Sequence, residues 1–306
     1  MREYRKIENV FKSSAQIDIT GSAKLVFFSD CHRGQGDNID SFSKNHNAYI
    51  AALRHYYSKG FTYFELGDGD ELWENREFKP IADTYSGVFK ELMRFHQKGR
   101  LFMLYGNHDH VKKNKKWARQ NLFSYYNERE GRAVPMFPGI TIYEGIVLRH
   151  LESGGKILLI HGHQADFFNY TLAPLAKFLV RYVWRPLEAV GIKDPTSTSE
   201  NRSKKRMLER ILSSWSKKES VMLIAGHSHR TMFPKPGEAP YFNDGCCVHP
   251  RHVTAIEIAS GLITLVKWSV EARADGVLHV QRKEIAGPHQ LSDYFVSRTA
   301  FVPAQS

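Results

Sequence analysis

Short clusters of aspartate, asparagine and histidine recur along the chain, each directly after an apolar run. The first contains Asp30 and His32, beyond the apolar run 25–28. Carboxylate, amide and imidazole groups are ligands of hard and borderline divalent metals. Together the five clusters contain Asp30, His32, Asp68, Asn107, His108, His161, His227 and His229. This set includes no cysteine in a ligand spacing, which favours an open catalytic site for Mn²⁺, Fe or Zn²⁺ over a closed structural zinc site.

The apolar runs before these clusters are predicted to be strands. The first run, 25–28, lacks the alternation of a half-buried strand, so both of its faces should be buried. Open α/β sheets place ligand sites beyond the carboxyl ends of their strands. The strands expected to lead into the clusters are 24–29, 61–66, 101–105, 156–160 and 221–225. Four of the clusters also contain a glycine, which permits close backbone approach to an ion or a phosphate.

The remaining chain supplies elements that must support these strands. Helices are predicted at 43–59, 81–97 and up to residue 126, whereas residues 1–20 read as a polar lead-in. The chain after residue 240 is predicted to form successive antiparallel strands, at 241–243, 253–258, 262–268 and 278–285. Alternating strands and helices followed by a run of strands predict an α/β (α+β) fold in which helices flank two packed sheets.

Composition limits the class of protein. The 306 residues are 42% apolar and 25% charged, as is typical of a soluble globular protein. Residues 1–10 are largely polar and no apolar run approaches the ~20 residues of a membrane span. Three cysteines without a framework spacing are typical of free thiols in a reducing cytoplasm. The net charge of +11 favours an anionic partner, either nucleic acid, a membrane surface or a phosphorylated substrate.

The order and spacing of the five clusters resemble the signature of the calcineurin-like metallophosphoesterase superfamily. That signature reads D-x-H, G-D-x-x-D/E, G-N-H-D/E, H and G-H-x-H. The matching positions are Asp30 with His32, 67–71, 106–109, His161 and 226–229. The resemblance covers about 24–230, two thirds of the chain. It implies a four-layer αββα sandwich, here a single domain over 1–306 with a helical cap inserted at 164–219.

The resemblance also implies a site for two divalent metals, with Mn²⁺ as the first choice. One metal would be held by Asp30, His32 and His229. The other would be held by Asn107, His161 and His227. Asp68 would bridge the two. Such a site would hydrolyse a phosphate monoester, diester or pyrophosphate by attack of a metal-bound hydroxide.

Further residues near the clusters receive roles from the same resemblance or from their position. His108 would stabilise the phosphate or protonate the leaving group, and Asp109 would orient its ring. Arg33 would contact a substrate phosphate or form a salt bridge at the rim. Asp70 is either a group that supports the metal ligands or a solvated turn residue. Three neighbours are interpreted as having no part in the chemistry: Cys31, His110 and His163.

The insertion at 164–219 is longer than the core topology requires and is rich in aromatic and basic residues. Lys177, Arg181 and Arg185 share one face of a predicted helix and are candidate substrate contacts. Three interpretations stay open: a lid for an anionic, partly apolar substrate, a helix on a membrane surface, or a structural hairpin with solvated charges. The position of the insertion resembles that in UDP-2,3-diacylglucosamine pyrophosphohydrolases, which hold acyl chains there. Those enzymes carry arginine in place of His108, so the histidine favours a general phosphoesterase with acid assistance.

These observations lead to one main hypothesis and three alternatives. The main hypothesis is a cytoplasmic metallophosphoesterase for a small or lipid-linked phosphate ester, with peripheral membrane contact through the cap. The first alternative is a nuclease of the same superfamily whose basic cap follows a nucleic-acid backbone. A protein serine/threonine phosphatase is less favoured, because the third cluster ends in Asp109 rather than glutamate. A scaffold with a degenerate site is the last alternative.

Overall fold

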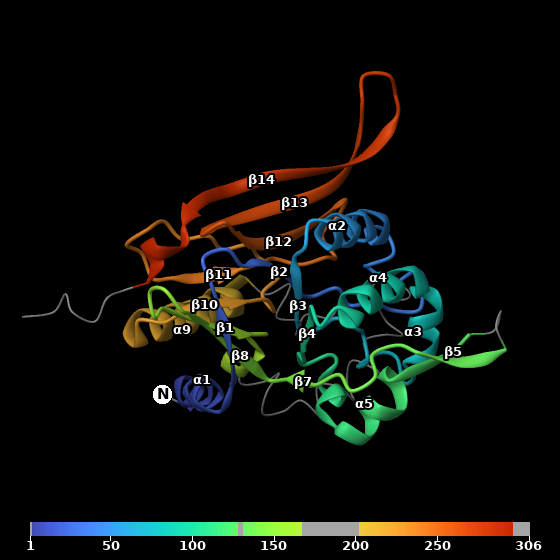
Figure 1. The fold of residues 1–306 in the computed structure, drawn as a ribbon, viewed down its shortest axis with the longest axis horizontal. Coiled ribbons are helices and arrows are strands. Elements are labelled where there is room, and N and C mark those ends of the chain that lie inside the picture. The colour runs from blue at the N-terminus through green and yellow to red at the C-terminus, as the bar shows by residue number, and fades with distance from the viewer. Residues whose placement is uncertain (1, 128–130, 167–201, 296–306) are drawn as a thin grey trace, which may run out of the picture.

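Two mixed β-sheets stack face to face in the computed structural model, which describes residues 2–127, 131–166 and 202–295 (Figure 1). The seven-stranded sheet has the order β14 (Leu278–Gln290), β13 (Leu262–Ala272), β12 (His252–Ala259), β2 (Lys24–Phe28), β3 (Thr62–Leu66), β4 (Leu101–Leu104) and β7 (Ile142–Tyr143). The five-stranded sheet has the order β1 (Ala15–Ile19), β8 (Gly145–His150), β9 (Lys156–Ile160), β10 (Met222–Ala225) and β11 (Tyr241–Asn243).

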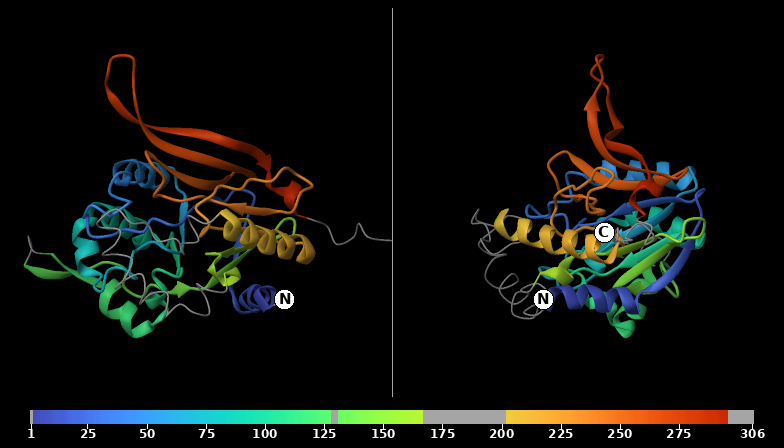
Figure 2. Two further views of the ribbon diagram at one scale, coloured as in Figure 1. Left: turned by 180° about the vertical axis from the view of Figure 1, so that it is seen from behind. Right: turned by 90° about the vertical axis from the view of Figure 1, so that its left-hand side faces the viewer.

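Helices cover the outer face of each sheet. The seven-stranded sheet packs against α2 (His46–Ser58) and α4 (Ser86–Gln97), with α3 (Lys79–Thr84) and α5 (Lys115–Leu122) beside them. The five-stranded sheet packs against α1 (Arg2–Ser13) and α9 (Arg202–Glu219), which lie side by side on its outer face (Figure 2). The layers therefore run helices, sheet, sheet, helices, which confirms the predicted four-layer fold class.

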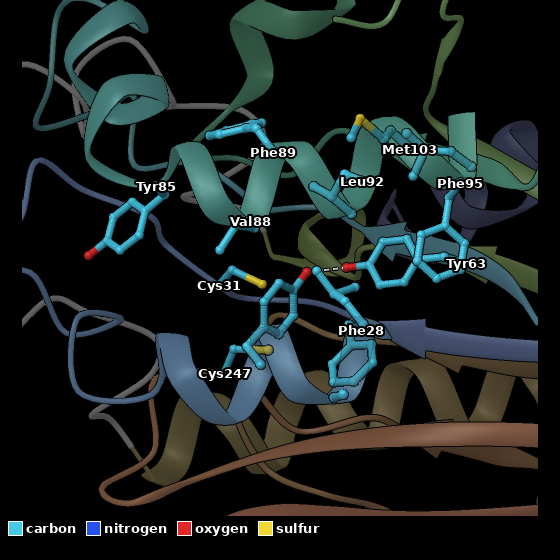
Figure 3. Close-up of a cluster of buried hydrophobic side chains, with 14 of the residues drawn as sticks. Phe28, Cys31, Tyr63, Tyr85, Val88, Phe89, Leu92, Phe95, Met103 and Cys247 are labelled. Carbon is cyan, nitrogen blue, oxygen red and sulfur yellow. Dashed lines mark hydrogen bonds between the residues drawn. The ribbon is translucent and has the colours of Figure 1, made fainter. Parts of the chain in front are cut away.

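Strand β2 shows why its sequence is apolar without alternation. Leu25 and Phe27 point into the core between the two sheets, whereas Val26 and Phe28 point into the core beneath α2 and α4. In this second core, Phe28 and Tyr63 of the sheet face helix α4 (Figure 3). Alternate side chains thus enter two different cores, and both faces of the strand are buried.

The strands that lead into the polar clusters are mutually parallel within each sheet. Strands β2, β3 and β4 pair in parallel, and so do β9 and β10. Parallel neighbours end at the same edge of a sheet, so the turns that follow them gather on one side of the sandwich.

Some elements differ from the prediction. Residues 1–20 form α1 and β1 rather than an irregular lead-in, because Ile7 and Val10 anchor α1 in a core with α9. The helix predicted at 81–97 is divided at Tyr85, whose hydroxyl donates to Asp40. The helix predicted up to residue 126 ends at Leu122, and a ribbon of β5 (Ser124–Asn127) and β6 (Arg132–Pro135) follows.

Part of the insertion is described. The insertion ends in helix α9 (Arg202–Glu219), which is rich in lysine and arginine. The predicted contacts Lys177, Arg181 and Arg185 lie outside the described residues, so the cap and the single-domain organisation stay predictions. In the ranges that the structure describes, no helix combines the length and apolar character that crossing a membrane requires.

Candidate metal centre

The turns after the strands hold most of the candidate ligands in an uncommon backbone conformation. The φ angles are positive at Asp30 (50°), His32 (46°), Asp68 (50°), His227 (68°) and His229 (53°). Residues other than glycine rarely adopt this left-handed region, and such outliers cluster at functional sites. Hydrogen bonds between the turns support them, since Asp30 N donates to Gly67 O (3.1 Å) and His32 N to Asp68 O (2.9 Å).

Each buried carboxylate has one oxygen held by the backbone and the other facing histidine nitrogens. Asp30 Oδ2 accepts from the His227 amide (2.8 Å), and Asp68 Oδ1 accepts from the His108 amide (2.8 Å). The other oxygen of each carboxylate lies 3.1 Å from the Nε2 atom of a histidine. Asp30 Oδ1 lies at this distance from His229, and Asp68 Oδ2 lies at this distance from His161. Each carboxylate is thus fixed by one oxygen and presents the other to a shared space.

The imidazoles are oriented in the same way. Nδ1 of His161 lies 2.9 Å from the Leu66 carbonyl, and Nδ1 of His32 lies 2.8 Å from a Glu71 carboxylate oxygen. Hydrogen bonds at Nδ1 leave the Nε2 lone pair free for a metal, an arrangement typical of ligating histidines.

The ligand atoms fall into two neighbouring groups. Asp30, His32 and His229 offer atoms within 4.8 Å of one another, and so do Asp68, His161 and His227. Asp68 Oδ2 also lies 3.8 Å from Nε2 of His32, in the first group. The structure thereby brings six of the seven predicted ligands, all but Asn107, together around two positions, with Asp68 next to both. A third group, formed by His32, Glu71 and His108, shares His32 with the first.

The residues present suit divalent metals. Among the buried side-chain atoms that have no hydrogen-bond partner within the described residues are one atom each of three predicted ligands: Asp30 Oδ1, Asn107 Oδ1 and His161 Nε2. Such atoms are costly to leave unpaired, and coordination of a cation would satisfy all three. Their mixed oxygen and nitrogen chemistry suits Mn²⁺, Fe or Zn²⁺.

Glycine is required where two turns meet the carboxylates. A Cβ atom at Gly106 would collide with the Asp68 carboxylate, and one at Gly226 would collide with Ser29 and lie 2.5 Å from Asp30 Oδ2. The predicted role of glycine, close backbone approach to the site, therefore holds at these two positions.

The ligands perturb one another electrostatically. Burial alone would raise the pKa of Asp30 and of Asp68, but neighbouring histidines hold both pKa values well below the usual range. Burial would lower the pKa of His161, and the carboxylates of Asp68 and Asp30 instead raise it to about 9. A cation at Nε2 of His161 would compete with a proton for this nitrogen.

The predicted partner of His108 is wrong. Nδ1 of His108 pairs with Glu71 (2.7 Å), and the ring stacks on Trp73 with centroids 4.5 Å apart. Asp109 is fully buried and accepts from the amides of Gly106 (2.7 Å) and Gly69 (3.0 Å). Asp109 thus fixes two turns, and Glu71 orients the rings of both His32 and His108.

Of the two roles predicted for Arg33, the structure shows the salt bridge, but in the interior of the protein rather than at the rim. The side chain is fully buried, and its guanidinium pairs with Asp70 (2.7 Å) and Glu65 (2.8 Å). Lys112, equally buried, pairs with Asp70 and Asp109, each at 2.7 Å. These five residues form a buried charge network, which also shows that Asp70 is not a solvated turn residue.

Two residues that support the centre were not among the predicted site residues. The sequence did contain an indication of the role of Glu71, because this residue occupies the acidic position that ends the second cluster. It contained no indication of the role of Lys112, since this residue lies in a basic stretch typical of a solvated surface. Cys31 is buried in the core, and all three cysteines are free thiols, as predicted from their spacing.

Comparison with known proteins gives the family. A model of the calcineurin-like phosphoesterases matches residues 23–246. Similar solved structures include Vps29 of Chaetomium thermophilum, at 11% identity and a TM-score of 0.40, covering 86% of this chain and 97% of that one. Another is a cold-active protein-tyrosine phosphatase of a psychrophilic Shewanella, at 12% identity and a TM-score of 0.35, with coverages of 86% and 81%. No curated protein gives a significant match. The matched region spans most of the chain and contains every candidate ligand, and the chain therefore belongs to the calcineurin-like phosphoesterases, which are metal-dependent phosphoric ester hydrolases.

Proposed function

We propose that the protein hydrolyses a phosphate ester at a centre for two divalent metal ions, with Mn²⁺ as the first choice. Asp30, His32 and His229 would hold one ion. Asn107, His161 and His227 would hold the other, with Asp68 between them. Bound ions would supply positive charge for a phosphoryl group under attack and lower the pKa of water. The observation that carries the proposal is the closeness of two groups of possible metal ligands. Asp68 belongs to the group with His161 and His227 and also lies 3.8 Å from His32 of the other group.

The other residues near the centre would position the substrate. His108 is 23% exposed at its side chain, and Glu71 and Trp73 hold its ring in place. With Nδ1 engaged by Glu71, Nε2 would donate to a phosphoryl oxygen or to the leaving group. The substrate would be a phosphate monoester, diester or pyrophosphate, of a small or lipid-linked molecule.

The test is hydrolysis of p-nitrophenyl phosphate and bis(p-nitrophenyl) phosphate by the Mn²⁺-loaded protein. Chelation should abolish activity and Mn²⁺ should restore it. Asp68→Asn should lower kcat/KM by at least about a hundredfold, since loss of even an outer group costs 10–100-fold. Asp83→Asn makes the same change at an exposed carboxylate and should have no effect.

Activity that survives both chelation and Asp68→Asn would overturn the proposal. A parallel assay with single-stranded oligonucleotides tests the nuclease alternative. Preferential cleavage of the oligonucleotides, with a steep salt dependence, would replace the small-ester substrate by nucleic acid.

A further inference from the structure

A cavity of about 430 Å³ opens beside the metal centre. Its walls come from four separate parts of the chain: the first turns of α9, the turn after β10, the segment around β12, and Ile285 of β14. Its volume is typical of a site for a small molecule. His229 lines the cavity and also places Nε2 3.1 Å from Asp30 Oδ1. The cavity and the metal centre therefore share a side chain, and a ligand at the metals would extend into the cavity.

The lining is basic. Lys205 and Arg206 contribute from α9, Arg230 from the turn after β10, and His249 and His252 from the opposite wall. Among the described residues, no carboxylate belongs to the lining. Glu209 accepts from Arg230 at 3.2 Å and compensates one of the three permanent cations. The remaining positive charge makes the cavity a favourable place for an anion.

Lys205 adds to this electrostatic argument. Its side chain is partly buried, and burial lowers the pKa of its ammonium group. A partly buried cation gains more from an anionic partner than a solvated one does. A bound anion would offset the desolvation that Lys205 bears in the free protein.

We propose that this basic cavity binds a second phosphoryl group of the substrate while the scissile one lies at the metals. The proposal rests on the proposed function for the position of the scissile group. It narrows the substrate to molecules with two phosphoryl groups, either directly linked as a diphosphate or separated as a bisphosphate. A phosphoryl group carries several acceptor oxygens, which suits the guanidinium and ammonium donors of the walls.

The first experiment measures binding without hydrolysis. Inorganic pyrophosphate is titrated calorimetrically into the chelator-treated full-length protein. Lys205→Ala combined with Arg206→Ala should weaken its affinity about tenfold to a hundredfold, since each side chain supplies a charge-assisted hydrogen bond. The matched control is Lys217→Ala with Lys218→Ala, which removes the same charge from the far end of α9. Equal affinities in the two double variants would overturn the proposal. Circular dichroism confirms that both variants are folded.

The second experiment measures the phosphate released from phenyl phosphate, phenyl diphosphate and benzene-1,4-diyl bisphosphate by the Mn²⁺-loaded protein. The Lys205→Ala/Arg206→Ala variant should reduce the preference for one doubly phosphorylated substrate over phenyl phosphate by about tenfold. A reduced preference for phenyl diphosphate would indicate that the two phosphoryl groups are directly linked. A reduced preference for benzene-1,4-diyl bisphosphate would indicate that they are separated. An equal loss on all three substrates would overturn the proposal. Absence of hydrolysis in the unaltered protein, with pyrophosphate binding lost only in the cavity variant, would overturn the proposed function and support the cavity.

Discussion

At the scale of single residues, the centre depends on side chains in which one polar atom is held by a hydrogen bond and a second polar atom faces the space between the candidate ligands. Glu71 is the clearest supporting case, because one buried carboxylate pairs with Nδ1 of both His32 and His108. Such carboxylate–histidine pairs hold a ring in the correct tautomer and raise its basicity. A single group thus sets the orientation of a candidate ligand and of the candidate acid.

Replacing Glu71 tests this shared role. Glu71→Gln keeps the shape but removes the charge, and should lower kcat/KM and Mn²⁺ affinity by about 10–100-fold each. Activity assays and a Mn²⁺ titration give both values. Glu77→Gln, an exposed neighbour, is the control. Equal values for both variants would show that Glu71 has no part in orienting the rings.

Sequence reasoning identified the candidate ligands but misjudged two of their neighbours. The ligands were predictable because each follows a strand and has a metal-binding side chain. Asp109 was assigned to His108 because the two are adjacent in the chain, yet the turn directs its carboxylate toward the backbone amides of Gly106 and Gly69. Arg33 was expected near the surface because its countercharges, Glu65 and Asp70, come from another strand and its turn. Such long-range charge pairing leaves no mark in local sequence.

At the scale of elements, the buried charge network joins the turns that follow β2, β3 and β4. Arg33 follows β2, Asp70 follows β3, and Asp109 and Lys112 follow β4. Removal of one partner from a buried ion pair leaves an uncompensated charge, which is far more costly than loss of a surface pair. The network therefore holds three ligand-bearing turns in register.

Lys112→Met should accordingly lower the free energy of unfolding by about 3–5 kcal/mol. Urea denaturation of the metal-free protein measures this difference. Lys113→Met changes the adjacent, exposed lysine and should alter stability by no more than about 0.5 kcal/mol. Similar stabilities for the two variants would mean that the network does not stabilise the turns.

Helices α2 and α4 are joined by a second, more exposed set of charges. Glu91 of α4 accepts from Arg54 of α2 (2.8 Å) and from Arg94 (2.6 Å). Burial alone would raise the pKa of Glu91, but the two arginines outweigh burial and lower it from 4.5. A lowered pKa in the folded state stabilises the protein above pH 4.5, and this contribution is lost as the pH falls through the folded value.

Glu91→Gln should therefore reduce stability at pH 6 by roughly 1 kcal/mol or less, because the arginines are largely exposed. The difference from the unaltered protein should shrink as the pH drops below about 4.5. Denaturation curves over this pH range provide the measurement. A difference that is constant with pH would indicate a packing effect instead of an ionic one.

At the scale of the whole molecule, the centre lies where the two sheets contribute turns to the same edge. Asp30, Asp68 and Asn107 follow strands of the seven-stranded sheet, and His161 and His227 follow strands of the five-stranded sheet. The general architecture was predictable from the apolar runs and their order. Helix α1 was not, because only Ile7 and Val10 of its twelve residues are buried and most of the other side chains are polar.

Because both sheets contribute candidate ligands, metal binding should stabilise the sandwich as a whole. Mn²⁺ at 100 times its dissociation constant would add about 2.7 kcal/mol to the free energy of unfolding. Thermal denaturation with and without Mn²⁺ should show a rise in Tm of several degrees, on the order of 2–4 °C per kcal/mol. Asp68→Asn should lose most of this rise and Asp83→Asn should keep it. An unchanged Tm for the unaltered protein would argue against ligands from both sheets.

The left-handed turns have a consequence for how an ion would be selected. The turns hold the backbone at five candidate ligands in this uncommon conformation. Donors on so constrained a backbone can adapt little to an ion, and a rigid cage discriminates by size and by preferred coordination geometry. The strained turns would thus lower the folding stability of the protein and, in return, fix the positions of the atoms that bind the metal.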